Sequence, residues 1–222
     1  LGYADAQTRR KRPNSEIVMK QTTRLLIAVT ALTMALFATS SFATERLRIV
    51  ASFSILGDMV QNVIGDHADL TTIVGPDADA HVYQPSVADA RAVADADVIF
   101  VNGMGFETWS DTLIAESGTR ASIHAATIGI TPVEVEGEID PHAWNLLLNG
   151  IVYVNNIAAV LSAKMPAHAD AIEQNRAAYV EQLRALDAST KETLATLPLE
   201  KRTVVTAHDA FGYLAHAYDM TF

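Results

Sequence analysis

Three histidines stand out because each lies in a loop or directly after a strand-like run. His81 lies in a polar loop, His142 follows the acidic stretch 134–138, and His208 follows the apolar segment 203–206. Imidazole is the commonest neutral ligand for transition metals near neutral pH, and three imidazoles suit Zn²⁺ well. Oxygen-rich ligand sets suit Mn²⁺ better, although raw affinity favours zinc over manganese. The residue types therefore indicate a divalent-metal site that favours zinc and leaves manganese possible.

Each of these three histidines has a plainer interpretation as a surface residue, and spacing alone does not decide between the two. The other four histidines occur in contexts typical of turns or helix faces, where a structural role is expected: His67, His124, His168 and His216. A local pair of histidines on one helix, as in HExxH metalloproteases, is absent from the sequence. A metal site would therefore have to be assembled from distant segments.

Strand-like and helix-like segments alternate along the chain before and after His81. We expect strands at 46–52, 70–74, 97–101 and near Ser122, and helices at 54–65, 85–96 and 107–115. The first of these helices would take Ser54 as its N-cap. Strands that alternate with helices of this length predict parallel βαβ units, with a sheet that is covered on both faces. The fold class is therefore α/β, and ligands of such sheets gather at the carboxyl ends of the strands.

The second half of the chain is predicted to be mainly helical. A helix around 151–161 is followed by a long one that Pro166 opens and that extends to about residue 198. A helix of that length suits a rigid connection between two lobes, and a coiled-coil segment is the alternative. A strand at 203–206 and a helix at 209–218 would begin a second lobe. We therefore divide the chain into an N-terminal lobe 44–148, a helical region 149–200 and a partial second lobe 201–222.

The N-terminal residues are predicted to be a leader. A basic start at Met19, an apolar run at 25–38 and a small-residue cleavage pattern that ends at Ala43 indicate a secretory signal peptide over 19–43. The apolar run is shorter than the roughly 20 residues that a membrane span needs. Residues 1–18 are interpreted as upstream sequence. We therefore expect the mature protein in the periplasm.

Composition excludes several kinds of site and partner. The chain has no cysteine, so disulfides, thiolate metal sites and a lipid anchor at the cleavage point are excluded. Residues 44–222 hold 10 basic and 24 acidic residues, a formal net charge of −14, against −10 for the whole chain. Such a surface repels nucleic acid and attracts cations, although acidity also serves simple solubility. We expect no nucleic-acid partner, and we expect a monomer.

Four ordered motifs resemble those of the periplasmic metal-binding proteins of zinc and manganese importers, the ZnuA/TroA-like class (cluster A-I). The motifs are Asp-Ala-His81, Glu107-Thr-Trp109, Asp140-Pro-His142-Ala-Trp144 and His208-Asp-Ala-Phe-Gly-Tyr213, and the similarity extends from about residue 48 to the last residue. The resemblance implies two Rossmann-like parallel-sheet lobes joined by a long helix, with the metal held between them. It also implies high-affinity capture of zinc or manganese and delivery to an ABC permease in the inner membrane.

In that class the histidines of three of these motifs are metal ligands, and they correspond here to His81, His142 and His208. Many manganese-type members have a Glu at the third position, so His208 favours zinc. The class also has a carboxylate ligand late in the second lobe, and we expect that lobe to be largely missing here. The chain also has glutamates at 134, 136 and 138 where many zinc-specific members insert a histidine-rich loop. With three protein ligands, weak metal binding is expected.

Two alternatives to a transport function remain open at this point. Three histidines around zinc with an open position could activate water in a hydrolase, with Asp209 or Glu107 as general base. A non-functional gene fragment is the other alternative. If the metal site forms, Asp140 and Asp209 are candidates to orient the histidine rings, and helix capping is the alternative for Asp209. Affinity should fall below about pH 6.5, because only neutral histidine binds metal.

Overall fold

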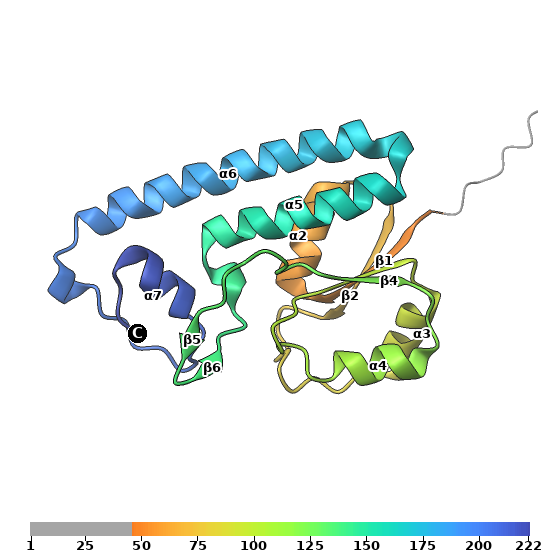
Figure 1. Cartoon of the computed structure of the whole chain (residues 1–222), viewed down its shortest axis with the longest axis horizontal. Helices are drawn as coiled ribbons and strands as arrows, with labels where there is room; N and C mark the ends of the chain where they lie inside the picture. The colour runs from red at the N-terminus through yellow and green to blue at the C-terminus, as the bar shows by residue number, and fades with distance from the viewer. Residues whose placement is uncertain (1–45) are drawn as a thin grey trace, which may run out of the picture. The chain divides into compact units, whose positions relative to one another are not determined.

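The computed structural model describes residues 46–222, and the predicted leader segments 1–18 and 19–43 lie outside the described residues. Four parallel strands form the main sheet in the order β2-β1-β3-β4 (Figure 1). They are β1 (Arg48–Phe53), β2 (Asp69–Val74), β3 (Val98–Val101) and β4 (Ser122–Ala125). The prediction of an α/β fold with a parallel sheet is confirmed.

Helices cover both faces of this sheet. Helix α2 (Ser54–Ile64) packs on β1 and β2 together with α5 (Leu147–Lys164), and α3 (Val87–Asp95) packs with α4 (Ser110–Ser117) on the opposite side (Figure 1). Burial on both faces explains why β1 and β3 are almost continuously apolar. Fully buried side chains from strands and helices form one core: Ile49, Leu56, Val60, Val63, Phe100, Tyr153, Ile157 and Leu161.

Several helix starts differ from the prediction by a few residues, and the cap of α2 differs as well. The N-cap of α2 is Phe53, and no side chain caps this helix. Ser54 is the first residue of the helix, so the prediction of Ser54 as the N-cap was wrong. Helix α4 begins at Ser110, after the predicted start at 107, because the side chain of Glu107 is buried and holds the preceding loop. The helix α2 ends at Gly65, whose φ of 58° lies in the left-handed region that glycine tolerates.

The long helix is α6 (Ala169–Ala195), with 27 residues, and a single 3₁₀ turn, Pro166–His168, precedes it. At 1.5 Å per residue it spans roughly 40 Å. It lies beside α5 and α2 through Ile172, Val180 and Leu183, and its last turns continue beyond α5 (Figure 1). It therefore connects the sheet-bearing part of the chain with the segment that carries His208.

After α6 the chain is mostly irregular. The 3₁₀ turn Leu199–Lys201 is followed by residues 202–211 without a helix, and then by α7 (Gly212–Tyr218). The predicted strand at 203–206 was wrong, since only an isolated bridge between Thr203 and Thr221 forms there. An apolar run becomes a strand only beside a partner, and the side chain of Val205 is 94% exposed. The helix predicted from 209 begins three residues later.

The acidic stretch before His142 forms a small hairpin. Strands β5 (Glu134–Val135) and β6 (Glu138–Ile139) pair antiparallel. The turn residues between them, Glu136 and Gly137, have φ values of 53° and 90°, which suits a tight two-residue hairpin turn. A 3₁₀ turn, Ala143–Asn145, then leads from His142 into α5. None of the helices in 46–222 has the length and apolar character needed to cross a membrane.

Candidate metal centre

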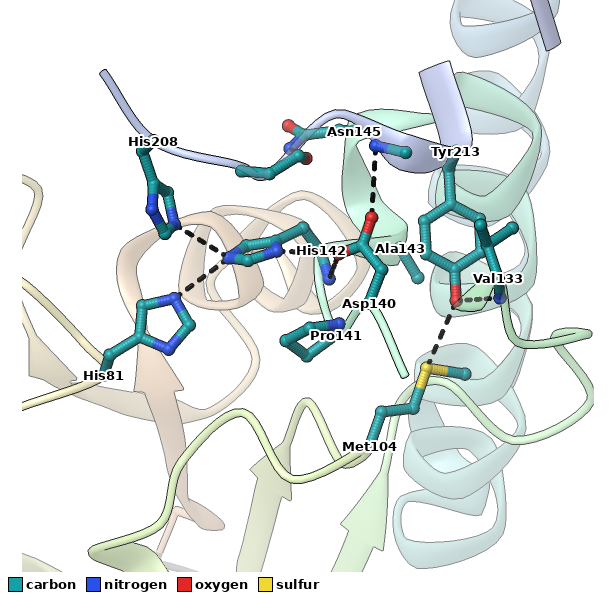
Figure 2. A network of polar contacts seen from close by, with 12 residues as sticks. His81, Met104, Val133, Asp140, Pro141, His142, Ala143, Asn145, His208 and Tyr213 are labelled. Carbon is teal, nitrogen blue, oxygen red and sulfur yellow. Dashed lines mark hydrogen bonds and ion pairs between the residues drawn. The ribbon is translucent and has the colours of Figure 1, made fainter. Parts of the chain in front are cut away.

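The structure brings together the three histidines that the sequence singled out. The Nε2 atom of His142 lies 2.9 Å from Nε2 of His81 and 3.1 Å from Nε2 of His208 (Figure 2). Their ring nitrogens form the one group of three or more potential metal ligands among residues 46–222, all within 4.8 Å of one another. Segments far apart in the sequence thus present three imidazole nitrogens to one point.

The two separations between His142 Nε2 and the Nε2 atoms of His81 and His208 are close to what a tetrahedral ion requires. Zn–N bonds of about 2.0–2.1 Å at tetrahedral angles separate ligand nitrogens by about 3.3 Å. The measured separations from His142 are a few tenths of an ångström shorter. Small side-chain movements are therefore enough to accept an ion, and three nitrogens leave a fourth position for water or a carboxylate.

His142 is the most firmly held of the three. Its ring Nδ1 donates to Oδ1 of Asp140 at 2.7 Å, and its backbone N–H donates to the same oxygen at 2.9 Å. The side chains of both residues are about 95% buried, at 6% and 5% exposure. Because Nδ1 carries the proton, Nε2 keeps its lone pair for a ligand role. The role predicted for Asp140, to orient a histidine ring, agrees with this geometry.

His81 is held by its loop and by an aromatic neighbour. Its backbone N–H donates to Asp79 Oδ1 at 2.9 Å, and the Trp109 indole N–H donates to the carbonyl of Ala80 at 2.7 Å. The ring of Phe106 lies edge-on to the His81 imidazole at 4.7 Å between centroids. Desolvation, followed by the neighbouring His142, lowers the pKa of His81, and the charge of Asp79 opposes this in part. His81 therefore stays neutral to a lower pH than a free histidine.

His208 is exposed and lies in the irregular segment 202–211. Its carbonyl accepts a hydrogen bond from Thr206 Oγ1 at 3.0 Å, which is a contact within its own loop. The segment is fastened to the rest of the molecule on the C-terminal side of His208. Asn145 Nδ2 donates to the carbonyl of Ala210 at 2.6 Å, and the N–H of Gly212 donates to Asp140 Oδ2 at 3.1 Å. Asp140 thus contacts both His142 and the segment that carries His208.

Comparison with known proteins identifies the family. Residues 49–222 match the family model described as zinc-uptake complex component A, periplasmic. The chain belongs to this zinc-uptake component family. The family is one of substrate-binding transport proteins, which agrees with the resemblance seen in the four motifs.

Individual relatives and solved structures show which proteins this chain is similar to. The manganese ABC transporter substrate-binding lipoprotein PsaA of Streptococcus pneumoniae is 36% identical, covering 90% of this chain and 70% of its own length. A Mn-bound periplasmic metal binding protein from candidatus liberibacter asiaticus superposes with a TM-score of 0.72 at 34% identity, over 78% of this chain and 66% of that one. Zn(II)-bound AdcA from Streptococcus pneumoniae gives 0.71 at 30% identity, over 79% and 38%. The chain thus spans about two thirds of the length of most of these relatives.

Asp209, the other predicted orienting residue, is not joined to a histidine by any hydrogen bond within 46–222. It is exposed, and it lines an open cavity of about 230 Å³ with His142, Asp140 and the β5–β6 hairpin. Capping does not explain it either, because α7 of this family member begins at Gly212 with Phe211 as its N-cap. A role of Asp209 in orienting a ligand stays a prediction.

A buried polar network under the site was not anticipated from the sequence. Glu107 is 6% exposed, and its carboxylate accepts hydrogen bonds from Ser52 Oγ at 2.5 Å and from the N–H groups of Asn102 at 2.6 Å and Gly103 at 3.3 Å. Burial raises the pKa of Glu107, and these hydrogen bonds oppose the rise. Since its oxygens are engaged with the sheet edge, this geometry does not favour Glu107 as a general base. The local sequence, a glutamate after a glycine-containing loop, does not indicate that the side chain of Glu107 is buried.

The remaining histidines occupy separate places. The rings of His67 and His168 stack on each other at 4.3 Å between centroids. His124 lies on β4 with its Nε2 buried and without a hydrogen-bond partner, and desolvation followed by the charge of Lys164 lowers its pKa. His216 lies in α7. None of these four joins the group of three described above.

Proposed function

We propose that this chain captures a divalent transition metal through His81, His142 and His208 and belongs to a metal importer. The single observation that supports this most strongly is the convergence of three Nε2 atoms from three distant segments, with 2.9 and 3.1 Å between neighbours. Membership of the zinc-uptake component family supports the same role. The metal is the transported substrate, and an ABC permease is the partner that would receive it.

We propose zinc as the favoured metal and manganese as its main competitor. Three imidazoles suit zinc, and the position filled by His208 supplies a third nitrogen where a carboxylate would favour a harder ion. The similarity to manganese-binding PsaA and to the Mn-bound structure supports manganese as the competitor. A water molecule or a carboxylate from outside this group of three would complete the fourth position.

The proposed setting is the periplasm, and the proposed role is binding without catalysis. An importer component must release its cargo unchanged, and the carboxylate of Glu107, one of the two candidate general bases, is engaged by hydrogen bonds from Ser52 and Asn102. The predicted signal peptide at 19–43 and the acidic residues that surround the described fold suit a protein that collects cations outside the inner membrane.

Isothermal titration of the 222-residue chain with Zn²⁺ and with Mn²⁺ tests this function. We expect one ion per chain, tighter binding of Zn²⁺ than of Mn²⁺, and loss of binding when the three histidines are replaced together by Ala. As a matched control, the His67→Ala/His168→Ala variant removes two histidines from the stacked pair and should bind as the wild type does. Equal binding by the wild-type chain and the triple variant would contradict the proposal.

A further inference from the structure

The loop that follows β3, residues 102–107, contributes no candidate ligand. It contacts His81 and His142, and it also contacts the segment that carries His208. Three consecutive residues in it have left-handed backbones: Gly103, Met104 and Gly105, with φ of 88°, 56° and 74°. Met104 is not a glycine, so this conformation is unfavourable for it and must be held by its surroundings. Glu107 supplies that support, because its buried carboxylate accepts from the N–H groups of Asn102 and Gly103.

Two side chains of this loop reach the first two histidines. The ring of Phe106 lies 4.7 Å from that of His81 and 5.8 Å from that of His142, both edge-on. Asn102 Nδ2 donates to the carbonyl of Pro141, the residue before His142, at 2.9 Å. The loop therefore supports the two histidines that belong to the sheet-bearing part of the chain.

The third contact reaches the segment that carries His208. The hydroxyl of Tyr213, in the first turn of α7, lies 3.6 Å from the Met104 sulfur and donates to it, and it accepts from the N–H of Val133 at 3.2 Å (Figure 2). Tyr213 is 3% exposed. Its burial raises the pKa of the phenol, so the hydroxyl keeps the proton that it donates to sulfur.

We propose that the Met104–Tyr213 contact is a latch that holds the His208 segment on the bound ion and sets the rate at which the ion leaves. The proposal rests on the proposed function, and it assigns a positioning role to two residues that bind no metal. His208 is the exposed member of the three, so it is the ligand that leaves first. Its departure requires the segment 208–213 to move away, and that movement separates the Tyr213 hydroxyl from both Met104 and Val133.

The latch differs from the two other attachments of the same segment. Asn145 and Asp140 bond the backbone at Ala210 and Gly212, and those contacts do not depend on side chains of the moving segment. Tyr213 attaches the segment through its own side chain, because its hydroxyl bonds to Met104 and Val133. Removal of the Tyr213 hydroxyl therefore weakens the closed state, in which segment 208–213 is docked beside Met104 and Val133. The three histidines and the hydrogen bonds of Asp140 are kept.

The test is the rate of metal release from the full chain loaded with Zn²⁺, measured by stopped flow with an excess of a colorimetric chelator. Tyr213→Phe removes the hydroxyl and leaves the Val133 N–H unpaired in the closed state, so release should be about tenfold faster. Met104→Leu keeps the apolar volume and the backbone penalty but loses the sulfur acceptor, which is weak, so about a twofold increase is expected. The association rate should be unchanged in both variants, and the Co²⁺ absorption spectrum should keep its tetrahedral bands.

Tyr218→Phe is the matched control, because Tyr218 lies in the same helix and donates its hydroxyl to Asp187 of α6, away from the histidines. Its release rate should stay that of the wild type, even if the melting temperature falls. Release from Tyr213→Phe at the wild-type rate, or equal acceleration by Tyr218→Phe, would overturn the latch while metal binding by the wild-type chain leaves the proposed function intact. Failure of the wild-type chain to bind Zn²⁺ or Mn²⁺ would instead overturn the proposed function, and the latch with it.

Discussion

The two sides of the candidate site are built very differently. The side chain of His142 is buried, and Asp140 accepts hydrogen bonds from both its ring and its backbone N–H. His208 is exposed on an irregular segment, and the contact of its backbone is with the neighbouring Thr206. His81 is intermediate, with a half-buried ring against Phe106. One side of the site is therefore fixed in advance, while the other depends on how a segment docks.

This contrast suits a protein that must both hold and release its cargo. Preorganised ligands lower the cost of binding, because little ordering remains to be done when the ion arrives. A ligand on a weakly held segment gives a route for release, since regions with few buried contacts open at low free-energy cost. The fixed side would give affinity, and the docked side would control how long the ion stays.

The largest expected effect comes from removing one histidine on each side. His142→Ala should weaken Zn²⁺ binding by more than about 100-fold, above the usual range for residues that only orient a ligand. His208→Ala should cost about 10- to 100-fold, because water can enter the exposed position and complete the coordination. Calorimetry on both variants measures the difference. Equal losses would remove the distinction between the two sides.

An effect smaller than that of His142→Ala is expected from the two acidic residues near the site. Asp140→Ala removes the acceptor of His142 Nδ1 and leaves the N–H of Gly212 unpaired, so affinity should fall by about 10- to 100-fold. Asp209→Ala, a change of the same kind at an exposed carboxylate, should alter affinity by about twofold or less. Competition with a chelator of known affinity gives both values. A larger loss for Asp209 would show that the docked side carries its own orienting residue.

The smallest effect concerns the stability of the sheet that carries the fixed side. His124 has a lowered pKa because of desolvation first and the charge of Lys164 second. As pH falls, His124 is therefore protonated in the unfolded chain, at a pKa near 6.5, before it is protonated in the folded chain. The contribution of neutral His124 to the stability of the fold is complete above about pH 6.5 and is lost as pH falls below that value.

Replacement of His124 by Leu removes this contribution. We expect the melting temperature of the apo protein to fall less steeply between pH 7 and 5 than that of the wild type. A residual slope of the same sign should remain, because the pKa of His81 is also lowered. Parallel melting curves for wild type and variant across this range would contradict the assignment.

The sequence predicts the fixed side of the molecule better than the docked side. Continuous apolar strands and helical spacing place β1, α2, β2 and α6 within a few residues of their observed bounds. These elements form through local pattern and through burial on both faces, which the sequence displays directly. The carboxyl-edge position of the His81 loop follows from the same parallel topology.

Features that depend on a pairing partner or on a turn conformation were not predictable in this way. Residues 203–206 have the apolar character of a strand, yet pairing is confined to the Thr203–Thr221 bridge. The β5–β6 hairpin forms although glutamates are poor strand formers, because the Glu136-Gly137 turn sets the pairing. The burial of Glu107 depends on hydrogen bonds from Ser52 and Asn102, and no pattern in the local sequence reveals them.

X-ray absorption at the zinc edge of the Zn²⁺-loaded chain tests the three-histidine site itself, because it counts the imidazoles on the ion. We expect three histidine nitrogens at about 2.0–2.1 Å from the zinc, with one further light ligand. The same spectrum of His208→Ala should show two histidines and an additional oxygen. A wild-type spectrum with one histidine or none would contradict the assignment of His81, His142 and His208 as the ligands.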